Sequence, residues 1–344
     1  MKIWIDIKNA HEPAFFKPFI KRFSTEEFYI TSREYAEITK LLQKYGIKHI
    51  SVGGHYGRNF LRKVIGRGII RNLKLMLKVP HFDVALSYMS MESILISKLR
   101  RKNSISFTDN ELPQLYTRIP TPFVDYLITP KAIPLQVLLS QGAKKNSVIQ
   151  FEGFKEDIYI ADYEPDRSFP KAIPFDNFIT IRPEALKAAY VSKDAKTIVP
   201  ELFSEFSKKN MPILYLPRYR DDMNYVKNYD NIYIPPAPLN GLDVCFYSRA
   251  VLTGSGTFAR EAACMGTPAV SFFPDAKLLA VDQEMVKKGW VFHSRDPKKI
   301  VDYALNSDKR KDDLSRSKKV QEEAFSIVKD ILEKCDRHGV RKNR

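Results

Sequence analysis

The fold is decided by a stretch that reads Ala250-Val-Leu-Thr-Gly-Ser-Gly-Thr-Phe-Ala-Arg-Glu-Ala-Ala-Cys-Met-Gly-Thr-Pro-Ala-Val-Ser-Phe-Phe-Pro274. Its apolar ends, residues 250–252 and 269–273, predict two buried strands. Residues 258–265 between them predict a short helix that stops at Gly266. Two glycines before the helix permit a tight turn. Strand, glycine turn, helix and strand in this order are typical of a parallel α/β sheet.

The glycine turn is a candidate phosphate site, because the N–H groups at a helix N-terminus carry partial positive charge. The turn residues expected to take part are Gly254, Ser255, Gly256 and Thr257. Glu261, one turn into the helix, could accept hydrogen bonds from the hydroxyls of an attached ribose. Glu261 could equally do no more than cap the first turn of the helix. Short glycine motifs are frequent by chance, so the spacing alone leaves both interpretations open.

Length and composition indicate an ordinary globular protein of two domains. The chain has 344 residues, 44% of them hydrophobic and 28% charged. It contains no apolar run of membrane-spanning length, and its start, Met1-Lys-Ile-Trp-Ile-Asp6, is typical of a strand and not of a signal peptide. We therefore expect a cytoplasmic protein. The three cysteines, at 245, 264 and 335, lack the spacing of a disulfide framework or a zinc site, so no metal is expected, and the first two are expected in the core.

The chain is strongly basic, with 56 Lys and Arg against 40 Asp and Glu and a net charge of +16. Nucleic acid, an anionic membrane surface and phosphorylated small molecules would all suit this charge. The acid-free stretch Arg58–Lys78 interleaves basic with apolar residues. It could form a basic amphipathic helix at the periphery of an anionic membrane, or a helix that packs by its apolar face and leaves the basic face solvated. Gly66 and Gly68 predict a break within it.

Strands and helices are predicted to alternate along both halves of the chain, which indicates parallel sheets. The first half has expected strands at 2–7, 28–31, 47–52, 82–87, 104–107, 124–129 and 148–153, and helices at 14–23, 33–45 (capped by Ser32), 91–99 and 130–139. The second has expected strands at 177–182, 211–216, 232–234, 250–252, 269–273 and 290–292, and helices at 196–209, 242–248, 258–265, 282–288, 297–304 and 311–335. Residues 161–174 are expected to link the domains and 336–344 to be disordered. The predicted domains are therefore 1–160 and 172–310, with 311–335 as a C-terminal helix.

Candidate catalytic and binding residues follow predicted strands, where ligands bind in such sheets. His11 could act as a general base or cap the next helix. Asp109 and Glu111 could hold a substrate hydroxyl and transfer protons, or cap the segment after them. Arg182 and Arg218 could bind a diphosphate by forked hydrogen bonds, or pair with surface acids.

The segment Thr253–Pro268 resembles the nucleotide-binding motif of UDP-N-acetylglucosamine 2-epimerases and related GT-B glycosyltransferases. Pro-Pro-Ala-Pro-Leu-Asn-Gly-Leu at 235–242 and Ile-Arg-Pro-Glu at 181–184 add to the resemblance. From Met1-Lys-Ile-Trp-Ile-Asp-Ile-Lys-Asn9 through Glu152-Gly-Phe-Lys-Glu156 and on to about residue 330, the chain is similar to the DUF354 family of bacterial and archaeal proteins.

The resemblance implies a GT-B-like α/β fold, in which two Rossmann-like domains with parallel sheets face a central cleft and the last helix packs back on the first domain. It implies that Ser255 and Gly256 hold the pyrophosphate of UDP and that Glu261 binds the ribose hydroxyls. Asp282 and Gln283 are similar in position to residues that touch the donor sugar in a glycosyltransferase of murein synthesis. His11 is similar in placement to a base in the first domain of such enzymes.

Two departures separate the chain from the epimerases. The epimerase pattern His-Arg-Arg-Glu reads Ile181-Arg-Pro-Glu184 here, and Thr-Glu-Arg-Pro-Glu is replaced by Pro274-Asp-Ala-Lys-Leu278. We therefore expect a metal-independent glycosyltransferase that uses a nucleotide-diphosphate sugar, a UDP-sugar by the resemblance, as co-substrate and no other cofactor. The alternatives are a 2-epimerase, a non-catalytic nucleotide-sugar-binding protein and a nucleic-acid-binding protein. The last is disfavoured because no nucleic-acid-binding module is recognisable.

Overall fold

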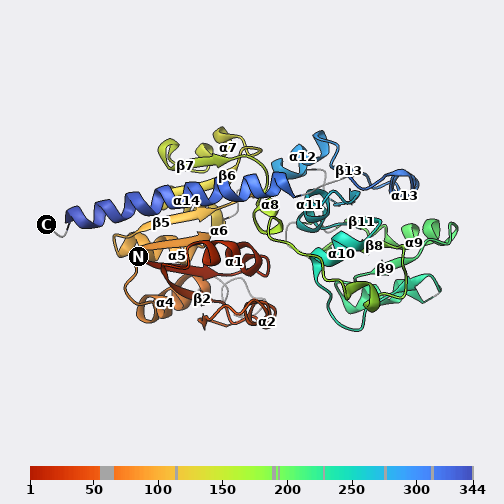
Figure 1. Ribbon diagram of the computed structural model, residues 1–344, viewed down its shortest axis with the longest axis horizontal. Helices are drawn as coiled ribbons and strands as arrows, with labels where there is room; N and C mark the ends of the chain where they lie inside the picture. Colours follow the sequence, from red (N-terminus) through yellow and green to blue (C-terminus); the bar gives the residue numbers. More distant parts are fainter. Residues whose placement is uncertain are drawn as a thin grey trace. The chain divides into compact units, whose positions relative to one another are not determined.

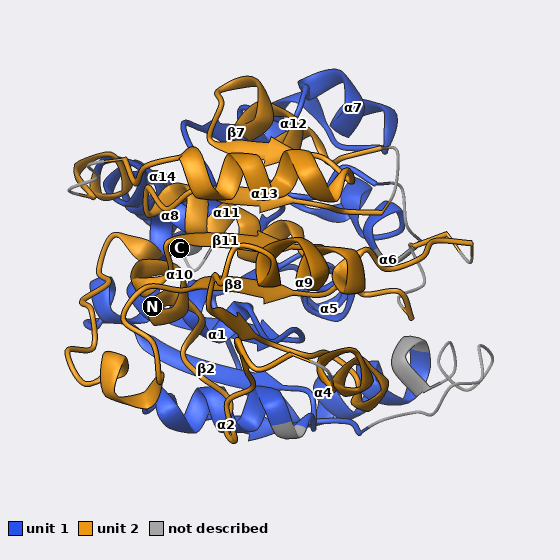
Figure 2. Ribbon diagram, turned by 90° about the vertical axis from the view of Figure 1, so that its right-hand side faces the viewer, with its two compact units in different colours: residues 1–159, 319–344 blue, residues 160–318 orange. Residues whose placement is uncertain are grey.

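The computed structural model describes residues 1–54, 66–112, 115–187, 191–192, 194–227, 229–274, 277–310 and 314–342. The chain divides into two compact units (Figure 2), of which unit 1 comprises residues 1–159 with 319–344 and unit 2 comprises residues 160–318. Figure 1 shows one sheet in each unit with helices packed against it. Every pair of neighbouring strands runs parallel, as the alternation of strands and helices predicts.

Unit 1 is built on a seven-stranded sheet in the order β3-β2-β1-β4-β5-β6-β7. Its strands are β1 Lys2–Ile7, β2 Glu27–Ser32, β3 Ile50–Ser51, β4 Val84–Tyr88, β5 Asn103–Phe107, β6 Tyr126–Pro130 and β7 Val148–Phe151. The chain moves outward from β1 to β3 and then returns to β4 on the other side of β1. This reversal makes the carboxyl edge between β1 and β4 the topological switch point of the sheet, where ligands bind in open α/β folds.

The helices of unit 1 enclose an apolar core. They are α1 Glu12–Arg22, α2 Ala36–Lys44, the π-helix η1 Gly66–Arg71, α4 Asn72–Lys78, α5 Met91–Leu99, α6 Leu115–Arg118, η2 Thr121–Phe123, α7 Leu135–Ser140, η3 Lys145–Ser147, α8 Lys155–Ile160 and α14 Ser315–Lys342, which enters the unit at residue 319. Phe325 of α14 packs edge-on against Phe19 of α1, with ring centroids 5.2 Å apart. Gln321 donates a hydrogen bond of 2.8 Å to the carbonyl oxygen of Ile158. The last helix is therefore part of the core of unit 1.

Unit 2 has a six-stranded sheet in the order β10-β9-β8-β11-β12-β13. Its strands are β8 Ile179–Arg182, β9 Ile213–Tyr215, β10 Ile232–Tyr233, β11 Ala250–Thr253, β12 Ala269–Ser271 and β13 Val291–His293. Its helices are η4 Phe169–Ala172, α9 Val199–Ser207, η5 Arg220–Val226, α10 Gly241–Tyr247, α11 Gly256–Cys264, α12 Ala280–Lys287 and α13 Pro297–Asn306. The stretch 250–274 thus folds as β11, α11 and β12, the predicted strand, helix and strand.

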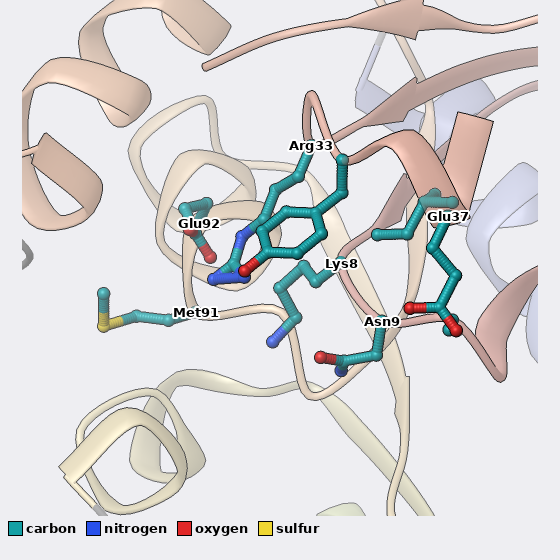
Figure 3. Close-up of a pocket in the computed structure, with 9 residues that line it drawn as sticks. Lys8, Asn9, Arg33, Glu37, Met91 and Glu92 are labelled. Atoms are coloured by element: carbon teal, nitrogen blue, oxygen red, sulfur yellow. The ribbon is translucent and has the colours of Figure 1, made fainter. Parts of the chain in front are cut away.

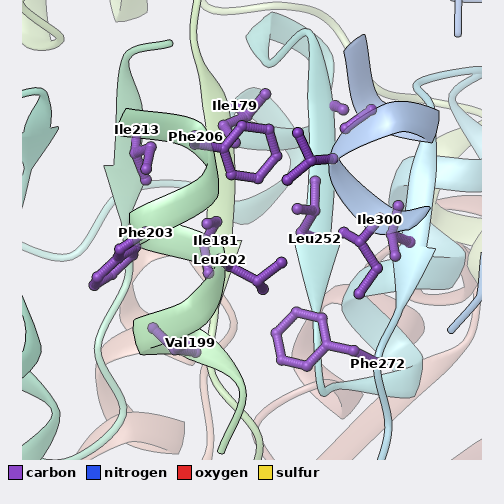
Figure 4. Packing of buried hydrophobic residues seen from close by; sticks show 14 of the residues in the cluster. Ile179, Ile181, Val199, Leu202, Phe203, Phe206, Ile213, Leu252, Phe272 and Ile300 are labelled. Atoms are coloured by element: carbon purple, nitrogen blue, oxygen red, sulfur yellow. The ribbon is translucent and has the colours of Figure 1, made fainter. Parts of the chain in front are cut away.

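The core of unit 2 joins one face of this sheet to two helices (Figure 4). Val199, Leu202, Phe203 and Phe206 recur along α9 with the spacing of one helix face, and all four are buried. They pack in one cluster with Ile181 and other buried side chains of the sheet and α13. Burying a side chain of this size contributes roughly 1.5–3 kcal/mol.

Four local expectations were wrong or incomplete. Ser32 is the last residue of β2 and not a helix cap; α2 begins at residue 36 without a side-chain cap. The strand expected at 47–52 is reduced to β3. Residues 161–174, expected to be a linker, pack on unit 2, where Asp243 accepts hydrogen bonds from the Tyr163 hydroxyl (2.6 Å) and the Asp166 N–H (3.0 Å). α14 continues to residue 342 through the expected disorder, because no proline interrupts it.

Candidate functional site

A pocket of about 470 Å³ opens at the carboxyl ends of three strands of unit 2. Arg182 at the end of β8, the residues after β9 and β10, and the first turn of α11 form its walls. It is lined by Arg182, Leu216, Pro217, Ile234, Pro235, Pro236, Ala237, Pro238, Leu239, Gly241, Val244, Ser255, Thr257, Phe258 and Glu261. Sequence reasoning placed ligand binding at this edge of the sheet because the carboxyl ends of parallel strands lie together.

The first turn of α11 presents amide donors that no described residue uses. Gly256, Thr257 and Phe258 carry its first three N–H groups, and none of these donates to a residue within the described ranges. The N–H of Ser255, by contrast, donates to the Thr253 hydroxyl at 2.9 Å. The donors available to an anion are therefore at 256–258, one residue further along than the Ser255–Gly256 pair that the resemblance implied.

Gly254 is required by close packing. A Cβ atom at this position would lie 2.5 Å from Cα of Glu184 and 2.8 Å from its nitrogen. The N–H of Gly254 donates to the carbonyl oxygen of Arg182 at 3.1 Å, which extends the pairing of β8 with β11. Glu184 itself is buried and accepts hydrogen bonds from Thr197 (2.8 Å) and Arg295 (3.1 Å). The glycine thus lets the turn lie directly against the loop after β8.

Arg182 and Glu261 bring opposite charges to this pocket. Arg182 ends β8, and its guanidinium lies 5.8 Å from the centroid of the Phe258 ring. Glu261 is half-buried on α11 and lines the same pocket. With Ser255 and Thr257, these make four predicted binding residues that the structure brings together in one cavity.

The other predicted binding residues of unit 2 are engaged beside the pocket. Nε of Arg218 donates to the carbonyl oxygen of Pro183 at 2.7 Å. Asp282 forms an ion pair of 2.6 Å with the buried Arg260. Gly256 leaves room for this pair, because a Cβ atom at position 256 would lie 3.0 Å from the Arg260 guanidinium. The side chain of Gln283 donates to the carbonyl oxygen of Leu278 at 2.8 Å. Direct contact of these side chains with a ligand stays a prediction.

The apolar side of the pocket was not among the predicted site residues. Phe258 supplies an aromatic ring next to Arg182, and the segment 234–239 and Leu216 form an apolar wall. A signal was present in the sequence, because Pro235-Pro-Ala-Pro238 directly follows the short strand predicted at 232–234, and prolines hold such a loop rigid.

The predicted catalytic residues lie in unit 1. His11 is at the N-cap position of α1 but makes no side-chain capping bond; its ring packs edge-on against Tyr88, with centroids 5.1 Å apart. Asp109 is buried and forms an ion pair of 2.6 Å with Lys155, whose ammonium lies 5.4 Å from the Tyr88 ring centroid. His11 and Asp109 thus belong to one cluster, linked through Tyr88 and Lys155.

Glu111, the third predicted catalytic residue, is also buried. Its main-chain carbonyl oxygen accepts a hydrogen bond from the side chain of Gln141. Its part in proton transfer stays a prediction.

Sequence reasoning missed a buried ion cluster beneath the carboxyl edge of β1. Nη1 and Nη2 of Arg71 donate to the two carboxylate oxygens of Asp6 at 3.0 and 2.7 Å, and Nη1 lies 3.1 Å from Glu92. Nε of Arg71 donates to the carbonyl oxygen of Val52 at 3.0 Å. Burial acts to raise the pKa of Asp6, but the Arg71 guanidinium, together with hydrogen bonds from Ser90 and Thr31, holds this pKa below its ordinary value.

Arg71 therefore corrects the interpretation of the basic stretch Arg58–Lys78 as a helix with a solvated basic face. Residues 58–65 lie outside the described part of the chain. In the remainder, Arg71 is buried, while Ile69, Leu73 and Leu77 are exposed. Contact of this stretch with an anionic membrane stays a prediction. None of the described helices combines the length and apolar character needed to cross a bilayer.

The three cysteines are buried. Cys245 and Cys264 are buried free thiols, as predicted, and so is Cys335. Within the described ranges, no three His, Cys, Asp or Glu side chains gather as a metal site would require.

Comparison with known proteins identifies the family and the fold. The sequence profile of the family described as "Protein of unknown function (DUF354)" matches residues 1–336, which confirms the resemblance. An uncharacterized protein of Methanocaldococcus jannaschii is 26% identical over 315 residues, covering 88% of this chain and 90% of that protein.

Two solved structures illustrate the likeness in fold. UDP-GlcNAc 2-epimerase from Methanocaldococcus jannaschii, in complex with UDP-GlcNAc and UDP, has a TM-score of 0.71 at 16% identity, over 95% of this chain and 99% of its own. The glycotransferase of kitacinnamycin has a TM-score of 0.62 at 8% identity, over 97% of this chain and 98% of its own. These likenesses confirm the GT-B-like α/β fold with two Rossmann-like units.

Proposed function

The chain belongs to the DUF354 family, and we propose that it is a glycosyltransferase that binds a nucleotide-diphosphate sugar, a UDP-sugar, in the pocket of unit 2. The observation that carries the proposal is that Arg182, Glu261 and the first turn of α11 line one cavity, and that the N–H groups of this turn donate to no described residue. To bind a nucleoside diphosphate, a site needs hydrogen-bond donors for the phosphate oxygens, a positive charge to balance them, and a hydrogen-bond acceptor for the ribose hydroxyls. This pocket supplies all three.

Each part of the donor has a matching feature in the pocket. The N–H groups of residues 256–258 and the guanidinium of Arg182 would hold the diphosphate, because a helix N-terminus and an arginine fork both bind phosphate oxygens. The Glu261 carboxylate would accept hydrogen bonds from the ribose hydroxyls. The apolar wall at 234–239 would cover the base.

The same groups would assist departure of the nucleotide. Negative charge grows on the diphosphate as the bond to the sugar breaks, and fixed donors aimed at that charge lower the barrier. Arg182 and α11 supply this positive charge without a metal ion. His11 is the proposed base for the proton of the acceptor, and Asp109, already in an ion pair with Lys155, would be a weaker base.

A 2-epimerase is the second candidate, because solved structures with this fold include proteins of that name. The position of the expected histidine argues against it. Ile181 stands there, has no titratable group, and is wholly buried in the core of unit 2. NMR of UDP-N-acetylglucosamine after incubation with the protein decides between the two: formation of the mannosamine epimer would favour the epimerase.

Calorimetric titration of the full chain with UDP tests the binding step. Glu261→Gln removes the charged acceptor, and we expect it to weaken binding by about tenfold or more, the usual effect of losing a hydrogen bond to a charged group. Glu201→Gln, at an exposed position on α9 outside the pocket, is the matched control and should bind as the wild type does. Absence of saturable UDP binding, or equal weakening in both variants, would refute the proposed site.

A thermal-shift screen against nucleotide sugars identifies the donor, because a ligand that binds only the folded state raises its apparent stability. Transfer itself is then measured as release of the free nucleotide from the best donor in the presence of candidate acceptors.

A further inference from the structure

Unit 1 has a second pocket, of about 480 Å³, that no part of the proposed donor site uses. Lys8 and Asn9 after β1, Arg33 and Glu37 after β2, and Glu92 after β4 line it (Figure 3). It lies at the switch point of the seven-stranded sheet, where chain topology favours ligand binding. Its volume is in the range of sites for small organic molecules.

Lys8 brings a positive charge into this pocket that the described residues leave unpaired. Its ammonium donates one hydrogen bond, of 2.6 Å, to the carbonyl oxygen of Met89, although an ammonium has three donors. No described carboxylate forms an ion pair with it. Burial lowers the pKa of Lys8 below its ordinary value. The charges of Glu92, Glu12 and Asp6 oppose this shift without cancelling it, and repulsion from Arg33 adds to it. A cation in such surroundings is costly unless an anion joins it.

The neighbouring acids do not fill this role. Asp6 and Glu92 are both bound by Arg71, at 2.7 and 3.1 Å. Glu12 accepts hydrogen bonds of 2.7 Å from the Lys8 backbone N–H and from the Asn9 side chain, and burial raises its pKa to about 7, so that it carries only part of its charge at neutral pH. Figure 3 shows the side chains of Lys8 and Arg33 both extending into the pocket.

We propose that the pocket of unit 1 binds a small anionic molecule, with its phosphate or carboxylate group between Lys8 and Arg33. Asn9 and Glu37, both exposed at the rim, can hydrogen-bond to hydroxyl groups of the same molecule. A sugar phosphate or a sugar acid has this chemistry. The proposal goes beyond the donor site and does not depend on it, since every residue that carries it belongs to unit 1.

Calorimetry of the full chain with glucose 6-phosphate, glucuronate and glucose tests the proposal. We expect at least one of the two anions to bind saturably and glucose to bind far more weakly; the anion that binds identifies the group. Lys8→Met keeps an unbranched chain and removes the charge, and should weaken binding of the anion by about tenfold or more. Lys98→Met, at an exposed position on α5 of the same unit, is the matched control and should bind the anion as the wild type does.

UDP is titrated into the same three proteins. Equal UDP affinities would show that Lys8→Met leaves unit 2 intact, whereas failure of UDP to bind any of them would refute only the donor site. The anion site is overturned if neither anion binds the wild type, if glucose binds equally well, or if Lys8→Met retains the anion affinity.

Discussion

Replacing Arg71 with methionine is expected to destabilise unit 1 by about 3–5 kcal/mol, the usual cost of removing one partner from a buried ion pair. Arg71 is wholly buried and donates to Asp6 through both terminal nitrogens, at 3.0 and 2.7 Å. It also lies 3.1 Å from Glu92 and donates to the carbonyl oxygen of Val52 at 3.0 Å. Methionine fills similar space but leaves two buried carboxylates without a cation. Since domains are stable by roughly 5–15 kcal/mol, the variant should fold with a much reduced margin.

The loss of stability in the Arg71→Met variant should depend on pH, and it should be smaller in acid. In the wild type, Arg71 holds the pKa of Asp6 below its ordinary value, so this stabilisation is present above the unfolded pKa of about 3.9 and is lost as the pH falls through the folded pKa. Without Arg71, burial acts to raise the pKa of Asp6, so that the folded variant takes up protons at a higher pH than the wild type does. The difference in unfolding free energy between the wild type and the variant should therefore be smaller at pH 5 than at pH 7.

Urea unfolding followed by tryptophan fluorescence measures both effects. The chain has two tryptophans, Trp4 in unit 1 and Trp290 in unit 2, so a Trp290→Phe background makes the signal report on unit 1. Arg118→Met, at an exposed position of unit 1, is the control and should change the unfolding free energy by no more than about 0.5 kcal/mol. A loss in Arg71→Met no larger than in this control, or a deficit that is the same at pH 5 and pH 7, would refute the reasoning.

Two further predictions concern Gly254 and Glu12. Gly254→Ala places a Cβ 2.5 Å from Cα of Glu184 and should lower the unfolding free energy of unit 2 in urea by about 1–3 kcal/mol. In the control Gly241→Ala, the new Cβ would have its nearest neighbour at 3.7 Å, so the loss of stability should be smaller. Equal losses of stability in the two variants would contradict the steric argument. Burial raises the pKa of Glu12 to about 7, so the folded state binds the proton more tightly, and stability should fall as the pH rises from about 4.5 through 7. The Glu12→Gln side chain cannot ionise, so the unfolding free energy of this variant should rise relative to that of the wild type by up to about 3 kcal/mol between pH 4.5 and pH 9. If the unfolding free energies of the two proteins changed with pH in parallel, the prediction would be wrong.

Local sequence patterns predicted most of the architecture, because strand and helix periodicity and turn chemistry involve neighbouring residues. The stretch 250–274 folds as the expected strand, glycine turn, helix and strand. Gly254 and Gly256 mark a turn that the structure shows to be closely packed on both sides. Ser32 was misplaced because its capping pattern competes with pairing between β2 and its neighbours, which local sequence does not reveal.

Part of the candidate site was also predictable. Arg182 and Glu261 were each predicted to bind the ligand, because Arg182 ends one parallel strand and Glu261 lies on the helix that follows another. The structure places both in the lining of one pocket. Arg218 follows the next strand by the same logic, yet its guanidinium bonds to the backbone of Pro183. The strand ends determine which loops meet, but the direction of a long side chain depends on contacts that only the folded loops provide.

The sequence by itself determined the alternation of strands and helices, the glycine turn before α11 and the missing histidine at Ile181. Only the tertiary structure decided which charges are buried and paired. Arg71 lies in a basic stretch whose pattern suggests a solvated face, but its partners Asp6 and Glu92 are far from it in the chain. Because Arg71 pairs with Asp6 and Glu92, neither carboxylate forms an ion pair with Lys8, which lines the pocket of unit 1. Charge pairing depends on distance in space, and the fold alone brings residues 6, 8, 71 and 92 together beneath one edge of the sheet.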